Sequence, residues 1–203
     1  MAMTHVEKSD MTPEELWREA LRGHQPSWEA LYRLLGGRLY QFFLKNTGKP
    51  ELAMDKTQEV FERLWKHRES FIDGSLNTWV FRIARNLLID LWRRKPRAEI
   101  LAEDPPEVVD PAIGVEESVL TKLHREDMLR HIDDSLNELS EDDRLILGVV
   151  YLGGLSLPEL ASVMEIPLGT AKTRCRQARL RLDRLLQERL KGQTPTLEAK
   201  ETA

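Results

Sequence analysis

The chain contains one cysteine, Cys175, in 203 residues, so no internal disulfide can form and the disulfide-stapled class of small secreted domains is excluded. No apolar run reaches the ~20 residues of a membrane-spanning helix, and the N-terminal segment MAMTHVEKSD has no hydrophobic signal region. We therefore expect a cytoplasmic protein with no membrane insertion.

Alternation of apolar and polar residues, the mark of a half-buried strand, is also absent. Apolar residues recur instead at helical spacing, which predicts an all-α fold. No nucleophile with a base, no phosphate loop and no metal-ligand cluster is recognisable; His124 and His131 fit a solvated helix face better than a metal site. We therefore expect neither an enzyme nor a bound metal or cofactor.

Charge is distributed unevenly, although the formal net charge is only -4. Residues 170–191 hold eight Lys or Arg and residues 78–97 hold six, whereas residues 98–118 hold seven acids, three prolines and no base. An acidic segment interrupted by proline cannot form a core and stays extended. We expect two small helical domains, 1–97 and 119–191, joined by the acidic linker 98–118 and followed by a disordered tail, 192–203.

The segment from Ser156 to Leu186 has the pattern of a helix-turn-helix. A capping box formed by Ser156 and Glu159 begins a short helix. Pro167 and Gly169 are expected to break that helix, because Pro disfavours helix in the residue before it and Gly has a permissive backbone. A second helix rich in arginine follows the break.

This second helix separates a stripe of small apolar residues from a polar face. Ala171, Cys175 and Ala178 lie on the apolar stripe. On the opposite face, Arg and Gln side chains can read base edges in a major groove while flanking cations neutralise phosphates. The candidate duplex-binding residues are Thr170, Lys172, Thr173, Arg174, Arg176, Gln177 and Arg179. A solvated amphipathic helix is the alternative interpretation.

Two helices in the N-terminal half also have distinctive outer faces. In the first, Met54, Val60, Phe61 and Leu64 are expected to point inward and Asp55, Glu59, Glu62 and Lys66 outward, with Gln58 and Trp65 at the margins. The second, from about Leu76 to Arg94, turns Arg82, Arg85 and Asn86 away from its core stripe and has Trp79 near its start. Cations among aromatic and amide side chains suit single-stranded nucleic acid. The alternative makes Trp79 and Trp92 core residues.

Taken in order along the chain, these motifs resemble one family. They are Asp55-x-x-Gln58-x-x-Phe61-x-x-x-Trp65, the block from Thr78 to Asn86, the basic run Arg93-Arg94-Lys95, Leu139-Ser140-x-x-x-Arg144, Gly154-Leu155-Ser156-x-x-Glu159-Leu160-Ala161 and Ile166-Pro167-x-Gly169-Thr170-x-Lys172-x-Arg174-x-x-x-Ala178-Arg179. The ordered set is similar to the extracytoplasmic-function sigma factors of bacterial RNA polymerase, which belong to the sigma-70 superfamily.

The resemblance implies a non-catalytic subunit that gives core RNA polymerase its promoter specificity. Its partners would be promoter DNA, an anti-sigma factor and core polymerase, which it would contact at the β′ clamp and the β flap. The polymerase-binding residues would be Asp55, Gln58, Glu59, Glu62 and Trp65. The minus-10 element would be melted and bound by Asp73, Ser75, Asn77, Trp79, Arg82, Arg85 and Asn86, and the recognition helix would read the minus-35 element.

Some alternatives stay open at this point. Lys56 and Thr57 stand where the family usually has apolar residues, which affects the expected polymerase contact, and Cys175 replaces a usual Leu or Ile. The acidic linker either threads the polymerase channel later used by RNA or is a solvated tether. The second functional hypothesis is a stand-alone helix-turn-helix regulator with an N-terminal oligomerisation or sensing module.

Overall fold

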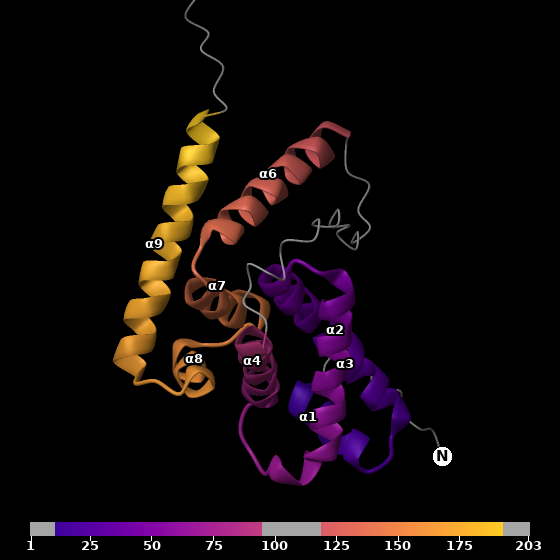
Figure 1. Ribbon diagram of the computed structural model, residues 1–203. Helices are drawn as coiled ribbons and strands as arrows, with labels where there is room; N and C mark the ends of the chain where they lie inside the picture. The colour runs from indigo at the N-terminus through magenta and orange to yellow at the C-terminus, as the bar shows by residue number, and fades with distance from the viewer. Residues whose placement is uncertain (1–10, 95–118, 193–203) are drawn as a thin grey trace, which may run out of the picture.

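The computed structural model describes residues 11–94 and 119–192, and helices account for most of this part of the chain. The N-terminal half comprises α1 (Pro13–Leu21), α2 (Gln25–Thr47), α3 (Pro50–Lys66), a short 3-10 helix (Arg68–Ser70) and α4 (Leu76–Arg94) (Figure 1). The C-terminal half comprises α6 (Val119–Glu138), α7 (Glu141–Leu147), a π-helical turn (Gly148–Leu152), α8 (Leu157–Met164) and α9 (Leu168–Gly192). The described residues contain no strand, so the all-α prediction is confirmed. The predicted acidic linker and the tail beyond residue 192 lie outside the described residues.

Local sequence signals explain where the first helices begin and end. The Thr12 hydroxyl accepts from the backbone N–H of Glu15 at 3.2 Å, and the Glu15 carboxylate accepts from the backbone N–H of Thr12 at 2.8 Å. These reciprocal bonds form the expected capping box at the start of α1. Gly48 ends α2 in the left-handed region, with φ of 70°, and its N–H donates to the carbonyl of Leu44.

α2 lies at the centre of the N-terminal half and contacts both α1 and α3 (Figure 1). Leu31, Leu35, Leu39 and Phe42 on α2 have no exposed surface. The inward face of α3 differs from the prediction at one position, because Met54 is 58% exposed. The buried stripe of α3 runs instead through Ala53, Thr57, Val60, Phe61 and Leu64. Thr57 is tolerated there because its hydroxyl donates to the carbonyl of Ala53 at 2.7 Å.

The two halves share one hydrophobic core. The π-helical turn and α7 contact α2, while α8 contacts α4. Gly148 allows this close approach, since a Cβ atom at this position would lie 3.0 Å from the ring of Phe42. The ammonium of Lys45 on α2 also pairs with the carboxylate of Asp133 on α6 at 2.5 Å. The C-terminal half is therefore packed directly on the N-terminal half.

Arg144 connects α7 to the end of α6. It is only 1% exposed, and its guanidinium donates to the carbonyls of Leu136, Asn137 and Leu139 at 2.7, 3.1 and 2.7 Å. The last carbonyls of a helix have no partners within the helix, so this guanidinium caps α6. The Arg144 in the Leu139-Ser140-x-x-x-Arg144 motif therefore has a structural role.

Candidate nucleic-acid and polymerase interfaces

The turn between α8 and α9 has a left-handed residue, but it is not glycine. The carboxylate of Glu159 accepts from the backbone N–H and the hydroxyl of Ser156, at 2.9 and 2.7 Å, which confirms the capping box of α8. Glu165, the residue that directly follows α8, has a φ of 56°. The expectation that Gly169 lies in the break is wrong, because α9 already begins at Leu168. The fixed φ of Pro167 starts the helix, and its carbonyl accepts from the N–H of Ala171.

The outer face of α9 is available for binding. Ala171 and Ala178 have no exposed surface and Cys175 is 6% exposed, so the predicted apolar stripe is buried. The opposite side exposes Lys172, Thr173, Arg174, Arg176, Gln177 and Arg179, with Thr170 half-buried at the edge. None of these arginines, nor Lys172, pairs with a carboxylate among the described residues. Burial raises the pKa of the Cys175 thiol, which agrees with a packing role for this residue.

A salt bridge orients α9 relative to α7. The guanidinium of Arg181 donates to both carboxylate oxygens of Asp143, at 2.8 and 2.6 Å, and the Asp143 side chain is only 9% exposed. Both bonds come from one guanidinium nitrogen, Nη1, and they tie the middle of α9 to α7.

An aromatic cluster supports the loop before α4. The ring of Phe71 stacks on Trp79 with the centroids 5.3 Å apart, and the ring of Trp17 packs edge-on against Trp79 at 5.7 Å. Trp79 is half-buried in this cluster, as the core interpretation of this residue predicts. The carboxylate of Glu14 accepts from the N–H of Leu76 at 2.8 Å, which ties the loop to α1.

The remaining candidate residues for the minus-10 element lie on this loop and on α4. Asp73 is exposed, and the hydroxyl of Ser75 accepts from the N–H of Thr78 at 3.2 Å, so Ser75 caps α4. The side-chain oxygen of Asn77 is buried and has no hydrogen-bond partner among the described residues. Asn86 is exposed and accepts from Arg85 at 3.0 Å. The structure thus places Asp73, Ser75 and Asn77 at the start of α4, whereas Asn86 lies in the middle of the helix, nine residues after Asn77 and on the opposite side.

Arg82 and Arg85 of α4 do not face solvent freely, because α8 and the residue after it lie against them. The guanidinium of Arg82 donates to the hydroxyl of Ser162 at 2.7 Å, and Arg85 lies 3.6 Å from the carboxylate of Glu165. The hydroxyl of Thr78 donates to the carboxylate of Glu159 at 3.0 Å. The contact therefore pairs candidate DNA-binding residues of α4 with the first helix of the helix-turn-helix.

Glu159 takes part in two structures at once, and its pKa reflects this. Partial burial alone would raise its pKa, but hydrogen bonds from Ser75, Ser156 and Thr78 lower the pKa to about 2. The carboxylate is thus charged at neutral pH, where it caps α8 and contacts the start of α4. The sequence indicated the cap, whereas the contact with α4 depends on tertiary packing.

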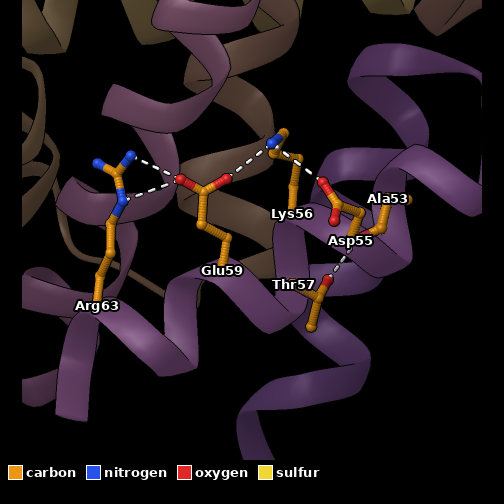
Figure 2. A network of polar contacts seen from close by, with 6 residues as sticks. All are labelled: Ala53, Asp55, Lys56, Thr57, Glu59 and Arg63. Atoms are coloured by element: carbon orange, nitrogen blue, oxygen red, sulfur yellow. Dashed lines mark hydrogen bonds and ion pairs between the residues drawn. The ribbon is translucent and has the colours of Figure 1, made fainter. Parts of the chain in front are cut away.

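The outer face of α3 carries a network of charges (Figure 2). The ammonium of Lys56 lies 3.1 Å from the carboxylate of Asp55 and 2.7 Å from that of Glu59. Arg63 donates to the other Glu59 oxygen at 2.7 and 3.1 Å. Burial alone would lower the pKa of Lys56, but its hydrogen bonds to Glu59 and Asp55 raise the pKa on balance. Burial alone would raise the pKa of Glu59, but its hydrogen bonds from Lys56 and Arg63 lower the pKa on balance. Figure 2 also shows the hydrogen bond from the Thr57 hydroxyl to the carbonyl of Ala53, on the buried side of the same helix.

The remaining candidate polymerase-binding residues lie near this network on α3. Gln58 and Glu62 are exposed, and Trp65 is 45% exposed at the end of the helix. The ring of Trp65 packs edge-on against Trp28 at 5.4 Å, and the guanidinium of Arg68 lies 5.2 Å from its centroid. A shallow pocket beside Trp65 is lined by Ala20, Gly23, Gln25, Trp28 and Trp65. Together these residues form an exposed face with aromatic and acidic side chains.

Two other kinds of site are absent from the described ranges, 11–94 and 119–192. No group of three or more His, Cys, Asp or Glu side chains there is placed to hold a metal ion. No helix of these ranges combines the length and apolar character that crossing a membrane requires.

Two family models match the chain. Sigma-70 region 2 matches residues 29–98, and Sigma-70 region 4 matches residues 129–182. Over 188 residues the chain is 30% identical to the ECF RNA polymerase sigma factor RpoE of Cereibacter sphaeroides, covering 90% of this chain and 98% of that protein. The chain belongs to the extracytoplasmic-function sigma factors of bacterial RNA polymerase.

Other relatives agree with this placement. The ECF sigma factor SigE of Mycolicibacterium smegmatis is 28% identical over 157 residues, which cover 77% of this chain and 60% of SigE. A solved structure of the sigma factor RpoE with the anti-sigma factor NepR, from Bartonella quintana, superposes with a TM-score of 0.60 at 25% identity and covers 79% of this chain and 96% of that one. The protein is thus an alternative sigma factor, which directs transcription initiation by RNA polymerase at promoters. The match to region 2 does not favour a stand-alone regulator.

Proposed function

We propose that the residues of this sigma factor divide promoter recognition between α9, which binds the minus-35 element as duplex, and α4 with its preceding loop, which binds the minus-10 element after melting. The face of α9 carries this proposal, since six polar or cationic side chains are exposed opposite the buried Ala171, Cys175 and Ala178. Arg176 and Gln177 in the middle of that face read base edges. Lys172, Arg174 and Arg179 contact phosphates, and Thr170 and Thr173 lie at the start of the helix.

At the minus-10 element, the loop and the start of α4 receive a base that has left the stack. Extracting a base costs a few kcal/mol, least where the duplex is already opening, so capture of the base favours melting. Asp73, Asn77 and Asn86 offer hydrogen bonds to base edges, while Arg82 and Arg85 follow the backbone of the single strand. Ser75 and Trp79 hold the loop in place, because one caps α4 and the other packs in the aromatic cluster.

The acidic and aromatic face of α3 binds the β′ clamp of core polymerase, through Asp55, Gln58, Glu59, Glu62 and Trp65, and the C-terminal domain contacts the β flap. We also propose an anti-sigma partner. The sigma factor in the matching Bartonella quintana structure is bound to the anti-sigma factor NepR. These roles need no catalysis and no cofactor, and place the protein in the cytoplasm with the polymerase. The domain boundaries proposed are 1–97 and 119–191, with residues 98–118 as the linker.

A transcription assay with purified components tests this function. A promoter selected by the protein should yield a specific transcript only when both the protein and core polymerase are present. Asp55→Lys should abolish co-purification with core while leaving the far-ultraviolet circular dichroism unchanged, because it reverses a charge on the exposed face of α3. Undiminished co-purification of the D55K variant contradicts the docking assignment. Tight, promoter-specific binding by the isolated chain would favour a stand-alone regulator instead.

A further inference from the structure

The docking role proposed for α3 needs carboxylates that can pair with a basic partner, yet two of them are already paired within the helix. Both oxygens of Glu59 are occupied, one by Lys56 and the other by Arg63. One oxygen of Asp55 also lies against the Lys56 ammonium (Figure 2). Of the three acids proposed to dock, only Glu62 makes no ion pair with the described residues.

Lys56 is held in this position by packing as well as by charge. Its side chain is only 19% exposed, whereas those of Asp55 and Arg63 are 65% and 40% exposed. A lysine can bury its methylene stem on an apolar surface and still bring its ammonium to a polar partner. The side chain thus fills a position next to the buried stripe of α3 and places its charge between two acids.

The network changes the electrostatics of the face. Asp55 and Glu59 carry two negative charges, and Lys56 and Arg63 carry two positive ones, so these four residues are neutral together. A basic partner has to share the Glu59 carboxylate with the two cations that already hold it, or displace one of them. Docking therefore exchanges ion pairs within the chain for ion pairs with the partner, and the net gain is small.

We propose that Lys56 determines how tightly this sigma factor docks, by competing with a basic surface of core polymerase for the carboxylates of Asp55 and Glu59. This inference rests on the docking role proposed for α3. Lys56 lowers the affinity for core and makes docking less sensitive to salt, because the number of ion pairs hardly changes. Replacing it by an apolar residue of similar length frees Asp55 and one oxygen of Glu59 for the partner, while Arg63 stays on the other Glu59 oxygen.

The test compares Lys56→Met with the wild-type protein in equilibrium binding to purified core polymerase at low and high salt. Lys66→Met is the matched control, since it removes the same charge from an exposed position at the end of α3. We expect K56M to bind about threefold to tenfold tighter than wild type at low salt, the range for one or two partly exposed ion pairs. This advantage should shrink at high salt, where newly formed pairs are screened, and K66M should change the affinity by less than about twofold.

The same substitution in a Glu59→Gln protein tests whether the gain in affinity depends on the Glu59 carboxylate. In a Glu59→Gln protein the same K56M change should gain less, because one of the two carboxylates that it frees is gone. Lys56→Leu repeats the test if K56M is found to unfold at a lower temperature than wild type. The proposal is overturned if K56M binds no tighter than K66M, or if its gain is the same in the E59Q background. If the wild-type protein does not bind core at all, the proposed function fails instead.

Discussion

At the scale of single residues, the face of α9 separates two ways of binding DNA. A guanidinium that donates two bonds to a guanine discriminates between bases, whereas a cation on a phosphate binds every sequence alike. Arg176 and Gln177 lie in the middle of the exposed face, and Lys172 and Arg179 lie at its edges. The position on the face therefore predicts which kind of contact each residue would make.

Arg176→Ala is expected to reduce discrimination at one position of the minus-35 element by about 1–3 kcal/mol, because a base-specific contact is lost. Lys172→Ala and Arg179→Ala should instead weaken binding to all sequences equally and flatten the salt dependence, since each removes a phosphate contact. Competition binding of the holoenzyme to promoters with single changes in this element measures both effects. If Arg176→Ala lowers the affinity for every promoter equally, that side chain contacts a DNA phosphate and not a base.

At the scale of elements, the start of α8 links the two halves of the molecule. Glu159 completes the capping box with Ser156, and its other oxygen accepts from Thr78 on α4. Only the charged carboxylate accepts all of these bonds. The helix cap and the contact between α8 and α4 therefore depend on the same ionisation.

This dependence predicts an acid-sensitive contribution to stability. The folded pKa of Glu159 is about 2, below the ordinary value of 4.5, so its contribution is complete above pH 4.5 and is lost as the pH falls towards about 2. Glu159→Gln should cost about 1 kcal/mol at neutral pH, as the loss of a helix cap does. The difference in urea midpoint between wild type and E159Q should then shrink across this acid range. A difference that stays constant with pH would show that ionisation of Glu159 does not matter.

At the scale of the whole molecule, the described arrangement keeps the two faces proposed to bind DNA close together. α8 contacts both α4 and α9, and helices are ~10 Å across, so the faces lie within roughly two or three helix diameters of each other. The names of the minus-10 and minus-35 elements imply about 25 base pairs between them, ~85 Å at 3.4 Å per base pair. The contact between α4 and α8 must therefore open before both elements are bound at once.

A repulsive charge in this contact should open it. Ser162→Arg places a cation opposite Arg82 and Arg85, so the free protein should expand in small-angle scattering and bind single-stranded minus-10 DNA more tightly. Gln187→Arg is the control, because it adds the same charge at an exposed position of α9. If both variants gain the same affinity for the single strand, the added charge alone explains the result and the contact does not cover the arginines.

The sequence by itself determined the helical class, the capping boxes at Thr12 and Ser156, and the division of α9 into a buried stripe and a polar face. These features follow from local chemistry, since a cap needs only neighbours along the chain and a stripe needs only the helical period. The family motifs could be read for the same reason, because each lies on one helix or one turn. Two local predictions were wrong: Gly169 lies inside α9 and not in the break before it, and Met54 is exposed and not buried.

The tertiary structure decided which of these residues are free and which are occupied. Arg82 and Arg85 look like solvent-facing cations in the sequence, but α8 provides their partners from residues about 80 positions away. Arg144 carries no sign in the sequence that its guanidinium will be buried against the end of α6. Helical spacing alone brings the Lys56 ammonium near Glu59, three residues on, but only packing leaves the Lys56 side chain no more than 19% exposed. Burial and long-range partners depend on how helices pack, and helical periodicity alone does not specify that packing.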